Sequence, residues 1–255
     1  MSSPAYRQMA AELRGAIEDG TYPAGSLLPK LVDLAQQYGV AKQTAREALA
    51  ELEVEGLIDV TRRRGTVVRR RPVRRRLTRS RQVYRDERGY YFDPTAQPWT
   101  ALEPPAIAWA PAPRDIATLL GLAEGQEGDD VLVRDRVMGE AATNTPLQLA
   151  TSYLPAPLAR GTRLAEKDTG PGGIYHLLEH MGHAPLSWEE AVSARMPTPT
   201  ESERLRLPKG VALLRILRTT TGPDGAVLEI NDTRMSADTF EIGYSLTRHT
   251  SAQQT

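Results

Sequence analysis

Residues 34–49 read LAQQYGVAKQTAREAL and carry the pattern of two helices joined by a tight turn. Apolar residues recur three and four positions apart on both sides of Gly39, which predicts helices over about 30–38 and 42–55. The inward residues of these helices are expected to be Leu31, Leu34, Ala35, Tyr38, Ala45, Ala48, Leu49 and Leu52. Gly39 allows the sharp change of direction that brings the two helices against each other.

The flanking segments complete a small domain. Residues 5–18 predict an amphipathic helix before this pair, and residues 57–60 and 66–68 predict two short strands after it. Gly56 is well placed to cap the third helix. Three helices followed by a hairpin with a basic tip are the elements of a winged helix-turn-helix, whose third helix lies in the major groove of DNA.

Side chains that suit base recognition lie early in the third helix, and arginines gather at the hairpin tip. Lys and Arg suit guanine, Gln suits adenine, and Thr can contact the thymine methyl group. Arginines at the tip would reach the phosphate backbone or the minor groove. The candidate DNA-contacting residues are Lys42, Gln43, Thr44, Arg46, Arg62, Arg63, Arg64 and Gly65. The alternative is a small helical core with solvated charges.

The net charge of the 255-residue chain is zero, but the charge is segregated. Residues 1–81 carry sixteen Lys and Arg against nine Asp and Glu, and residues 82–255 carry the matching acidic excess. Arginine fills eleven of the twenty positions from Arg62 to Arg81. A basic head on an acidic body predicts two domains with different partners, and the Arg-rich segment is interpreted as a linker near the DNA backbone. The alternative is a solvated linker that its own charge keeps extended.

Composition disfavours several classes of function. Without cysteine the chain has no disulfide, thiolate nucleophile or zinc–sulfur site, and no secretory signal or membrane-length apolar run is visible, which fits a cytoplasmic protein. His176 and His180 have a zinc-ligand spacing, but no Glu directly follows His176 and Gly182 is expected to end that helix. No metal site, cofactor or hydrolase triad is therefore predicted.

The second half alternates predicted strands with short helices. Strands are expected near 131–138, 147–153, 186–195, 211–219, 226–235 and 241–246, and helices near 114–122, 173–181 and 200–206. A Gly-Pro-Asp-Gly turn at 222–225 joins two of these strands, and the whole predicts an α+β fold with an antiparallel sheet. Arg134 and Arg136 lie two apart on one strand and share a face, where they could hold a phosphate or carboxylate. The alternative is that Arg134 and Arg136 only form ion pairs at the surface.

The segment between the two halves is rich in proline. Residues 93–113 contain six prolines and two tryptophans, Trp99 and Trp109. This density argues against a regular helix or a central strand, so an irregular loop is expected. The two tryptophans could flank a ligand pocket, or they could anchor a long loop to the core.

Spaced residues across 5–70 match the pattern of one family. They are Tyr6–Ala10, Ile17–Gly20, Pro23–Gly25, Leu28–Pro29, Leu34–Ala35, Tyr38–Val40, Thr44–Leu49, Leu52, Glu55–Leu57 and Arg64–Val68. With them the first domain resembles the DNA-binding domain of GntR-family bacterial transcription regulators, which implies DNA contacts by Lys42, Thr44, Arg46 and the Arg64–Gly65 wing tip. Residues 28–32 read LPKLV where the family usually has LPSER, and Lys30 is the candidate replacement for the missing arginine.

A second set of residues matches across about 85–248. They are Val131–Arg136, Thr151–Pro155, Gly172–Tyr175, Leu178–Glu179, Gly182, Glu203–Leu205, Gly210–Val211, Leu214–Ile216, Asp224–Glu229 and Asp238–Glu241. With them this half resembles the effector-binding UTRA domain of the HutC branch of that family, and so implies a chorismate-lyase-like fold with a deep pocket beside a sheet. The resemblance implies an effector site of Arg134, Arg136, Ser152, Tyr153, Tyr175 and Glu229. Ala150 and Gly173 depart from the sugar-phosphate sensors of the branch, so an anionic or more apolar metabolite is as plausible as a phosphorylated amino sugar.

The resulting hypothesis is a homodimeric repressor that binds a palindromic operator and responds to a small anionic effector. Its predicted parts are a DNA-binding domain over 1–70, an Arg-rich linker over 71–84 and an effector-binding and dimerisation domain over 85–250. One alternative is a DNA-binding protein whose second domain only dimerises. Another is an enzyme that uses the chorismate-lyase-like pocket, with Arg134 and Arg136 binding a dicarboxylate.

Overall fold

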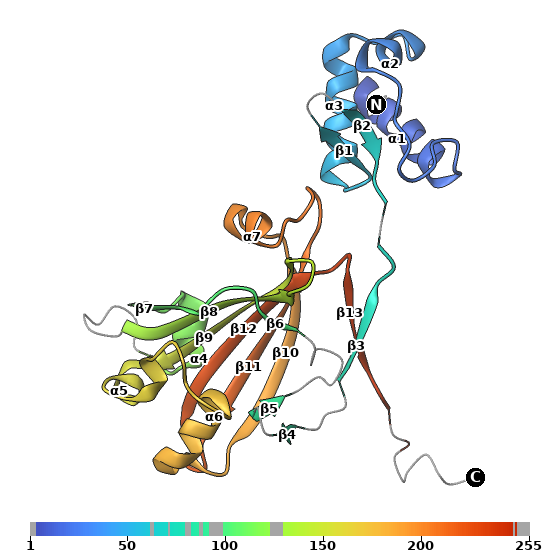
Figure 1. Cartoon of the computed structure of the whole chain (residues 1–255). Coiled ribbons are helices and arrows are strands. Elements are labelled where there is room, and N and C mark those ends of the chain that lie inside the picture. Colours follow the sequence, from blue (N-terminus) through green and yellow to red (C-terminus); the bar gives the residue numbers. More distant parts are fainter. Residues whose placement is uncertain are drawn as a thin grey trace.

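The computed structural model describes residues 4–61, 64–70, 72–79, 83–86, 89–91, 99–122, 130–246 and 248. Figure 1 shows a small helical head joined by an extended connector to a larger body built around a sheet. Among the helices of these residues, none combines the length and apolarity that crossing a bilayer requires.

The head has the predicted elements. They are α1 (Ala5–Glu18), α2 (Leu31–Gln37), α3 (Lys42–Val54) and the antiparallel pair β1 (Ile58–Thr61) and β2 (Gly65–Val68). The predicted inward residues of α2 and α3 pack with Met9 and Leu13 of α1 into one core, and Leu13, Leu34 and Leu52 are fully buried. The predicted winged helix-turn-helix is therefore confirmed.

The body is an antiparallel sheet in the order β10-β11-β12-β9-β8, and β6 and β7 both pair with β8 at one edge. Its strands are β6 (Thr100–Ala101), β7 (Ala106–Pro111), β8 (Asp130–Glu140), β9 (Thr145–Pro155), β10 (Ser187–Arg195), β11 (Leu213–Thr221) and β12 (Val227–Ser236). Its helices are α4 (Arg114–Leu119), α5 (Ala156–Ala159), the 3-10 turn η2 (Arg163–Ala165), α6 (Gly173–Leu178), the π-helical turn η3 (Glu179–His183) and α7 (Pro199–Arg204). The predicted α+β class is confirmed.

The two faces of the sheet are covered by different helices. On the first face, Leu132 and Leu154 pack with Tyr175 and Leu178 of α6. On the second face, Val131, Tyr153 and Ile230 pack with Ile116 of α4. Successive strand residues point to opposite faces, so each strand contributes to both layers.

The Pro-rich segment is more regular than predicted. Residues 106–111 form β7, a strand that pairs only with β8 among the described strands, and its proline, Pro111, lies at its end. Proline is tolerated there because a sheet edge leaves one side of the strand unpaired. Trp99 is buried, with its ring centroid 5.3 Å from that of Phe240. The Cζ atom of Arg160 lies over the Trp109 ring, 4.4 Å from its centroid. Both contacts fit the anchoring alternative.

The connector between head and body also departs from expectation. Its strand β3 (Arg75–Arg79) pairs in parallel with β13 (Phe240–Tyr244), and a second short pair joins β4 (Tyr84–Asp86) to β5 (Gly89–Tyr91). The strand predicted near 241–246 is present as β13, which stands outside the main sheet beside β3 (Figure 1).

The connector arginines contact the body. Arg75 Nη1 lies 2.9 Å from Glu140 Oε1, Arg76 Nε lies 2.6 Å from Glu241 Oε1, and Arg79 Nε lies 3.6 Å from Glu190 Oε2. Arg69 pairs with Asp238. These four arginines pair with carboxylates of the body, because its acidic excess lies within their reach. That the Arg-rich segment lies near the DNA backbone stays a prediction.

Helix α7 is held to the second face by ion pairs centred on Glu201. The Glu201 carboxylate accepts hydrogen bonds from Arg195 Nη1 and Nη2, both at 2.7 Å, and from Arg234 Nη1 at 3.2 Å. Burial alone would raise the pKa of Glu201, but hydrogen bonds from Arg195 and from the amide of Thr198, with the positive charges of Arg195 and Arg234, lower it from 4.5 to about 2. The ionised carboxylate therefore stabilises the folded state.

We expect Glu201→Gln to lower the free energy of unfolding by about 2 kcal/mol at pH 7, because Arg195 and Arg234 lose their charged hydrogen bonds to the carboxylate. The native pKa lies below the unfolded value, so this contribution is complete above about pH 4.5 and is lost as the pH falls toward 2. Urea unfolding at pH 7 and pH 3 measures it. Glu203→Gln, an exposed site on the same helix, is the control, and an equal loss in both variants would contradict the assignment.

Candidate functional site

The early residues of α3 form an exposed polar surface on the head. Lys42, Gln43 and Arg46 are exposed and Thr44 is half-buried, whereas Ala45 is fully buried. Gln43 Oε1 accepts a hydrogen bond from Arg46 Nη1 at 2.8 Å, and Gln43 Nε2 donates to Glu47 at 3.1 Å. The helix thus buries one face in the head core and presents hydrogen-bonding groups of the types that read base edges.

The hairpin tip and the start of α2 also expose predicted DNA-contacting residues. Arg64 and Gly65 are exposed at the turn between β1 and β2, and Gly65 has a φ of 94°, in the left-handed region that favours glycine. Arg62 and Arg63 lie outside the described residues. Lys30 is exposed directly before α2, as its predicted role needs.

A row of polar side chains crosses the first face of the sheet. The strand register aligns Arg134 of β8 with Ser152 of β9, Asn231 of β12, Arg218 of β11 and Glu190 of β10. Asn231 Nδ2 donates to Ser152 Oγ at 3.0 Å, and Arg218 Nη2 donates to Glu190 Oε1 at 2.7 Å. The row therefore forms a hydrogen-bonded polar layer inside an otherwise apolar face.

Arg134 uses much of its hydrogen-bonding capacity within the chain. Its Nη1 donates to the carbonyl oxygens of Leu164, at 2.8 Å, and Glu166, and its Nη2 donates to that of Lys167 at 3.2 Å. Burial lowers the pKa of Arg134, and the nearby charge of Arg136 lowers it further. Arg134 fastens the turn after η2 to the sheet.

Arg136 is placed differently. It lies two residues further along β8 on the same face, opposite Ala150 of β9, and is half-buried. Its Nε is buried and has no hydrogen-bond partner among the described residues. A buried guanidinium N–H without an acceptor is costly unless a ligand or water supplies one, so Arg136 is the candidate anion-binding group.

A carboxylate lies near the other end of this layer. Glu229 is fully buried, and its Oε2 accepts a hydrogen bond from Thr220 Oγ1 at 2.9 Å. The Tyr175 hydroxyl lies close to both Glu229 and Arg218, and burial raises the pKa of Tyr175, with Glu229 adding to the rise. Tyr175 also packs edge-on against Trp188, with ring centroids 5.7 Å apart. The site thus offers a cation, a carboxylate and an aromatic wall.

Tyr153 does not join the other five predicted effector residues. It follows Ser152 on β9 and therefore points to the second face, where it is buried against Ile116 and Ile230. The prediction that Tyr153 belongs to the effector site is therefore corrected, because strand alternation places its side chain on the opposite face from the other five residues.

Sequence reasoning missed three polar members of the site: Thr220, Asn231 and Arg218. Along β12 the polar residues Glu229, Asn231 and Thr233 recur at every second position, and this period-two pattern was a usable signal. Arg218 could not be found in this way, because its role depends on the register with β10 and β12. Within the described residues, no group of three His, Asp or Glu side chains is placed to hold a metal ion.

Comparisons with known proteins match both parts of the chain. The family described as bacterial regulatory proteins, gntR family, matches residues 5–68, and the UTRA domain matches residues 106–241. An uncharacterized HTH-type transcriptional regulator of Streptomyces coelicolor is 31% identical over 238 residues, covering 89% of this chain and 87% of the relative. The HTH-type transcriptional repressor NagR of Bacillus subtilis is 24% identical, covering 89% and 88%.

A solved structure agrees with these sequence matches. The crystal structure of a protein assigned to the GntR-family transcriptional regulators has a TM-score of 0.64 and 28% identity, and the match covers 97% of this chain and 99% of the other. The likeness extends over head, connector and body together.

The two arginines of the first face should behave differently when each is removed. We expect Arg134→Ala to lower the free energy of unfolding by about 3 kcal/mol, because the carbonyl oxygens of residues 164, 166 and 167 lose a charged donor. Hydrogen–deuterium exchange of the segment 163–168 should become faster. Arg136→Ala is the matched control and should leave that segment unchanged; faster exchange in both variants would refute the distinction.

Proposed function

The chain belongs to the gntR family of bacterial regulatory proteins and carries a UTRA domain, so it is a transcriptional regulator, and from this premise we propose that it is a repressor controlled by a small anionic metabolite. In this proposal a homodimer binds a palindromic operator through two heads, with half-sites about one helical turn apart. The relative NagR, which matches over most of its length, is a repressor, and this supports repression rather than activation.

The DNA-reading surface is proposed to be the exposed side of α3 with the wing. Lys42, Gln43, Thr44 and Arg46 would face the bases, and Arg64 the backbone or minor groove. Lys30 would add a phosphate contact at the start of α2. The exposure of these side chains on a well-packed head supports the assignment.

The effector is proposed to bind on the first face of the sheet. Arg136 would hold its anionic group, because its Nε is buried without an acceptor in the described structure. Glu229 and Ser152 would accept or donate hydrogen bonds to its polar groups, and Tyr175 would line the wall. Arg134 would contribute through the turn 163–167 that it fastens.

One observation carries the link between effector and DNA: the polar row of the first face ends on the connector. Glu190 binds Arg218 of the row at 2.7 Å and Arg79 of β3 at 3.6 Å. Because β3 leads directly to the head, a ligand that rearranges the row changes the position of the connector. For such control it is sufficient that the effector binds one of the two connector positions more tightly than the other by about 1–3 kcal/mol.

A second contact path runs through the other face. Asp135, next to Arg134 on β8, lies 2.5 Å from Arg204 of α7. The loop after α7 touches the end of α3, where Lys209 Nζ lies 3.1 Å from Glu53 Oε2. A Cβ added to Gly210 would lie 2.5 Å from the Val54 carbonyl oxygen, so the two backbones are in close contact. Movement of α7 would therefore reach the DNA-reading helix.

Replacing Lys42 and Arg46 together by alanine should weaken operator binding about 100-fold or more, since each base contact is worth about 1–3 kcal/mol. Gel shifts with the upstream DNA of its own locus, at several salt concentrations, measure the loss. Arg160→Ala, on the body, is the control. If the double variant kept the affinity and the salt dependence of the wild type, α3 would not be the reading helix.

Effector binding should depend on Arg136 and not on Tyr153. A panel of sugar phosphates and carboxylic acids that raise the melting temperature of the wild type identifies binders. We expect Arg136→Ala to abolish the increase and Tyr153→Phe to retain it, because Tyr153 faces the opposite side of the sheet. A body that only dimerises would show no increase with any of these compounds.

A further inference from the structure

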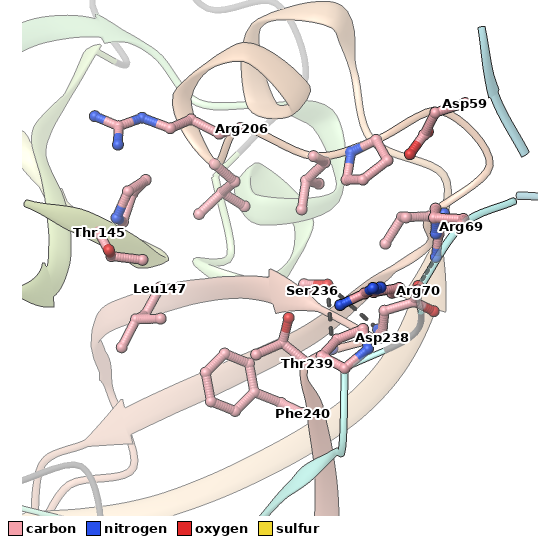
Figure 2. A pocket seen from close by; sticks show the side chains of 16 residues that line it. Asp59, Arg69, Arg70, Thr145, Leu147, Arg206, Ser236, Asp238, Thr239 and Phe240 are labelled. Atoms are coloured by element: carbon pink, nitrogen blue, oxygen red, sulfur yellow. Dashed lines mark hydrogen bonds and ion pairs between the residues drawn. The ribbon is translucent and has the colours of Figure 1, made fainter. Parts of the chain in front are cut away.

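A cleft of about 450 Å³ lies where head, connector and body meet, away from the first face of the sheet. Pockets that hold small molecules are typically about 300–1,000 Å³ and occur preferentially at domain interfaces. Its lining comes from all three parts: Asp59, Arg69, Arg70, Pro72, Thr145, Pro146, Leu147, Leu205, Arg206, Leu207, Pro208, Val211, Ser236, Asp238, Thr239 and Phe240. Figure 2 shows Thr145 and Arg206 toward one end of the cleft and Asp59 and Arg69 toward the other.

The walls of the cleft are apolar and firmly held. Leu147, Leu205, Val211 and Phe240 are each less than a tenth exposed, and all of them except Val211 belong to core clusters of the body. Pro72, Pro146, Leu207 and Pro208 extend this lining. An apolar body of a ligand would therefore be buried against residues that cannot collapse to fill the space.

The charges around the cleft leave cations without partners. Arg69 is paired with Asp238. Within the described residues, Arg70 and Arg206 have no carboxylate partner, and Asp59 is the remaining acidic group of the lining. Both arginines are exposed: the guanidinium of Arg70 lies against Gly25 of the head, and Arg206 lies at the end of the cleft near Thr145 (Figure 2). Because Arg70 is in contact with the head, Arg206 is the cation that we consider for a ligand.

The backbone at Arg206 supports a role for its side chain. Arg206 follows α7 with a φ of 52°, and the amides of Arg206 and Leu207 donate to the carbonyl oxygens of Glu203 and Ser202 at 3.1 and 2.8 Å. This is the helix-ending motif in which glycine is usual, because a side chain is strained at positive φ. Here an arginine occupies the position, and Figure 2 shows its side chain extending at the end of the cleft where Thr145 lies.

We propose that this cleft is a second ligand site, which takes a small amphipathic carboxylate. The apolar body of the ligand lies between the leucines and Phe240, and its carboxylate pairs with Arg206. Because the cleft is walled by Asp59 of the head and by Phe240 of the body, an occupant fixes the orientation of one on the other. The proposal does not depend on the effector site of the first face, whose residues line no part of this cleft.

Octanoate, with octanol and octylamine as neutral and cationic analogues, tests the proposal on the full chain. Titration calorimetry should show octanoate binding at least tenfold more tightly than octylamine. Hydrogen–deuterium exchange should become slower in the segments 69–70 and 205–211 when octanoate is bound. Slower exchange confined to the first face, around 134–136 and 229–231, would overturn the assignment to this cleft.

Variants separate the charge contact from the apolar one. Arg206→Ala should weaken octanoate about tenfold and leave octanol unchanged, while Thr145→Trp, at an exposed site on the rim, should weaken both by occupying the cleft. Arg160→Ala is the control for loss of an exposed arginine, and circular dichroism checks the fold of each variant. Arg136→Ala should bind octanoate as the wild type does, even if the anionic-effector proposal fails. Octanoate binding that survives both cleft variants would refute this site.

Discussion

The alternation of side chains along β8, β9 and β12 is the constraint on which the rest of the body depends. Arg134 and Ser152 point to the first face, whereas their neighbours Asp135 and Thr151 point to the second. One peptide unit therefore separates the proposed effector layer from the ion pairs that hold α7. A sheet with this alternation cannot shift a strand on one side without moving groups on the other, and in the proposed mechanism this would connect the effector layer to the head without a long chain of contacts.

The segregation of charge has two consequences in the folded chain. The head exposes cations such as Lys42 and Arg46, as its excess of Lys and Arg predicts for a domain that binds DNA. The connector arginines, by contrast, are bound to carboxylates of the body, with Arg75 on Glu140 and Arg76 on Glu241. DNA phosphates and body carboxylates thus offer the same kind of contact to one basic segment. Salt will weaken both, because most of these pairs are exposed or half-buried.

The two arginines of the first face illustrate how burial assigns roles to identical side chains. Arg134 donates to main-chain carbonyl oxygens and stabilises a turn, whereas the buried Nε of Arg136 has no acceptor within the described residues. A guanidinium that already has partners contributes position, and one that lacks them contributes affinity for an anion. The same principle distinguishes Arg69 from Arg206 at the cleft. Arg69 is paired with Asp238, whereas Arg206 has no carboxylate partner within the described residues.

The sequence by itself determined the features that depend on local periodicity. The three helices and wing of the head, the exposed Lys42 and Arg46, and the shared face of Arg134 and Arg136 all follow from spacings of two to four residues. Tertiary structure alone decided the partners of Arg134, the parallel pairing of β3 with β13, and the cleft between head and body. Those features join residues 30 to more than 160 positions apart, and no local pattern specifies which distant carbonyl, strand or carboxylate will lie within reach once the chain has folded.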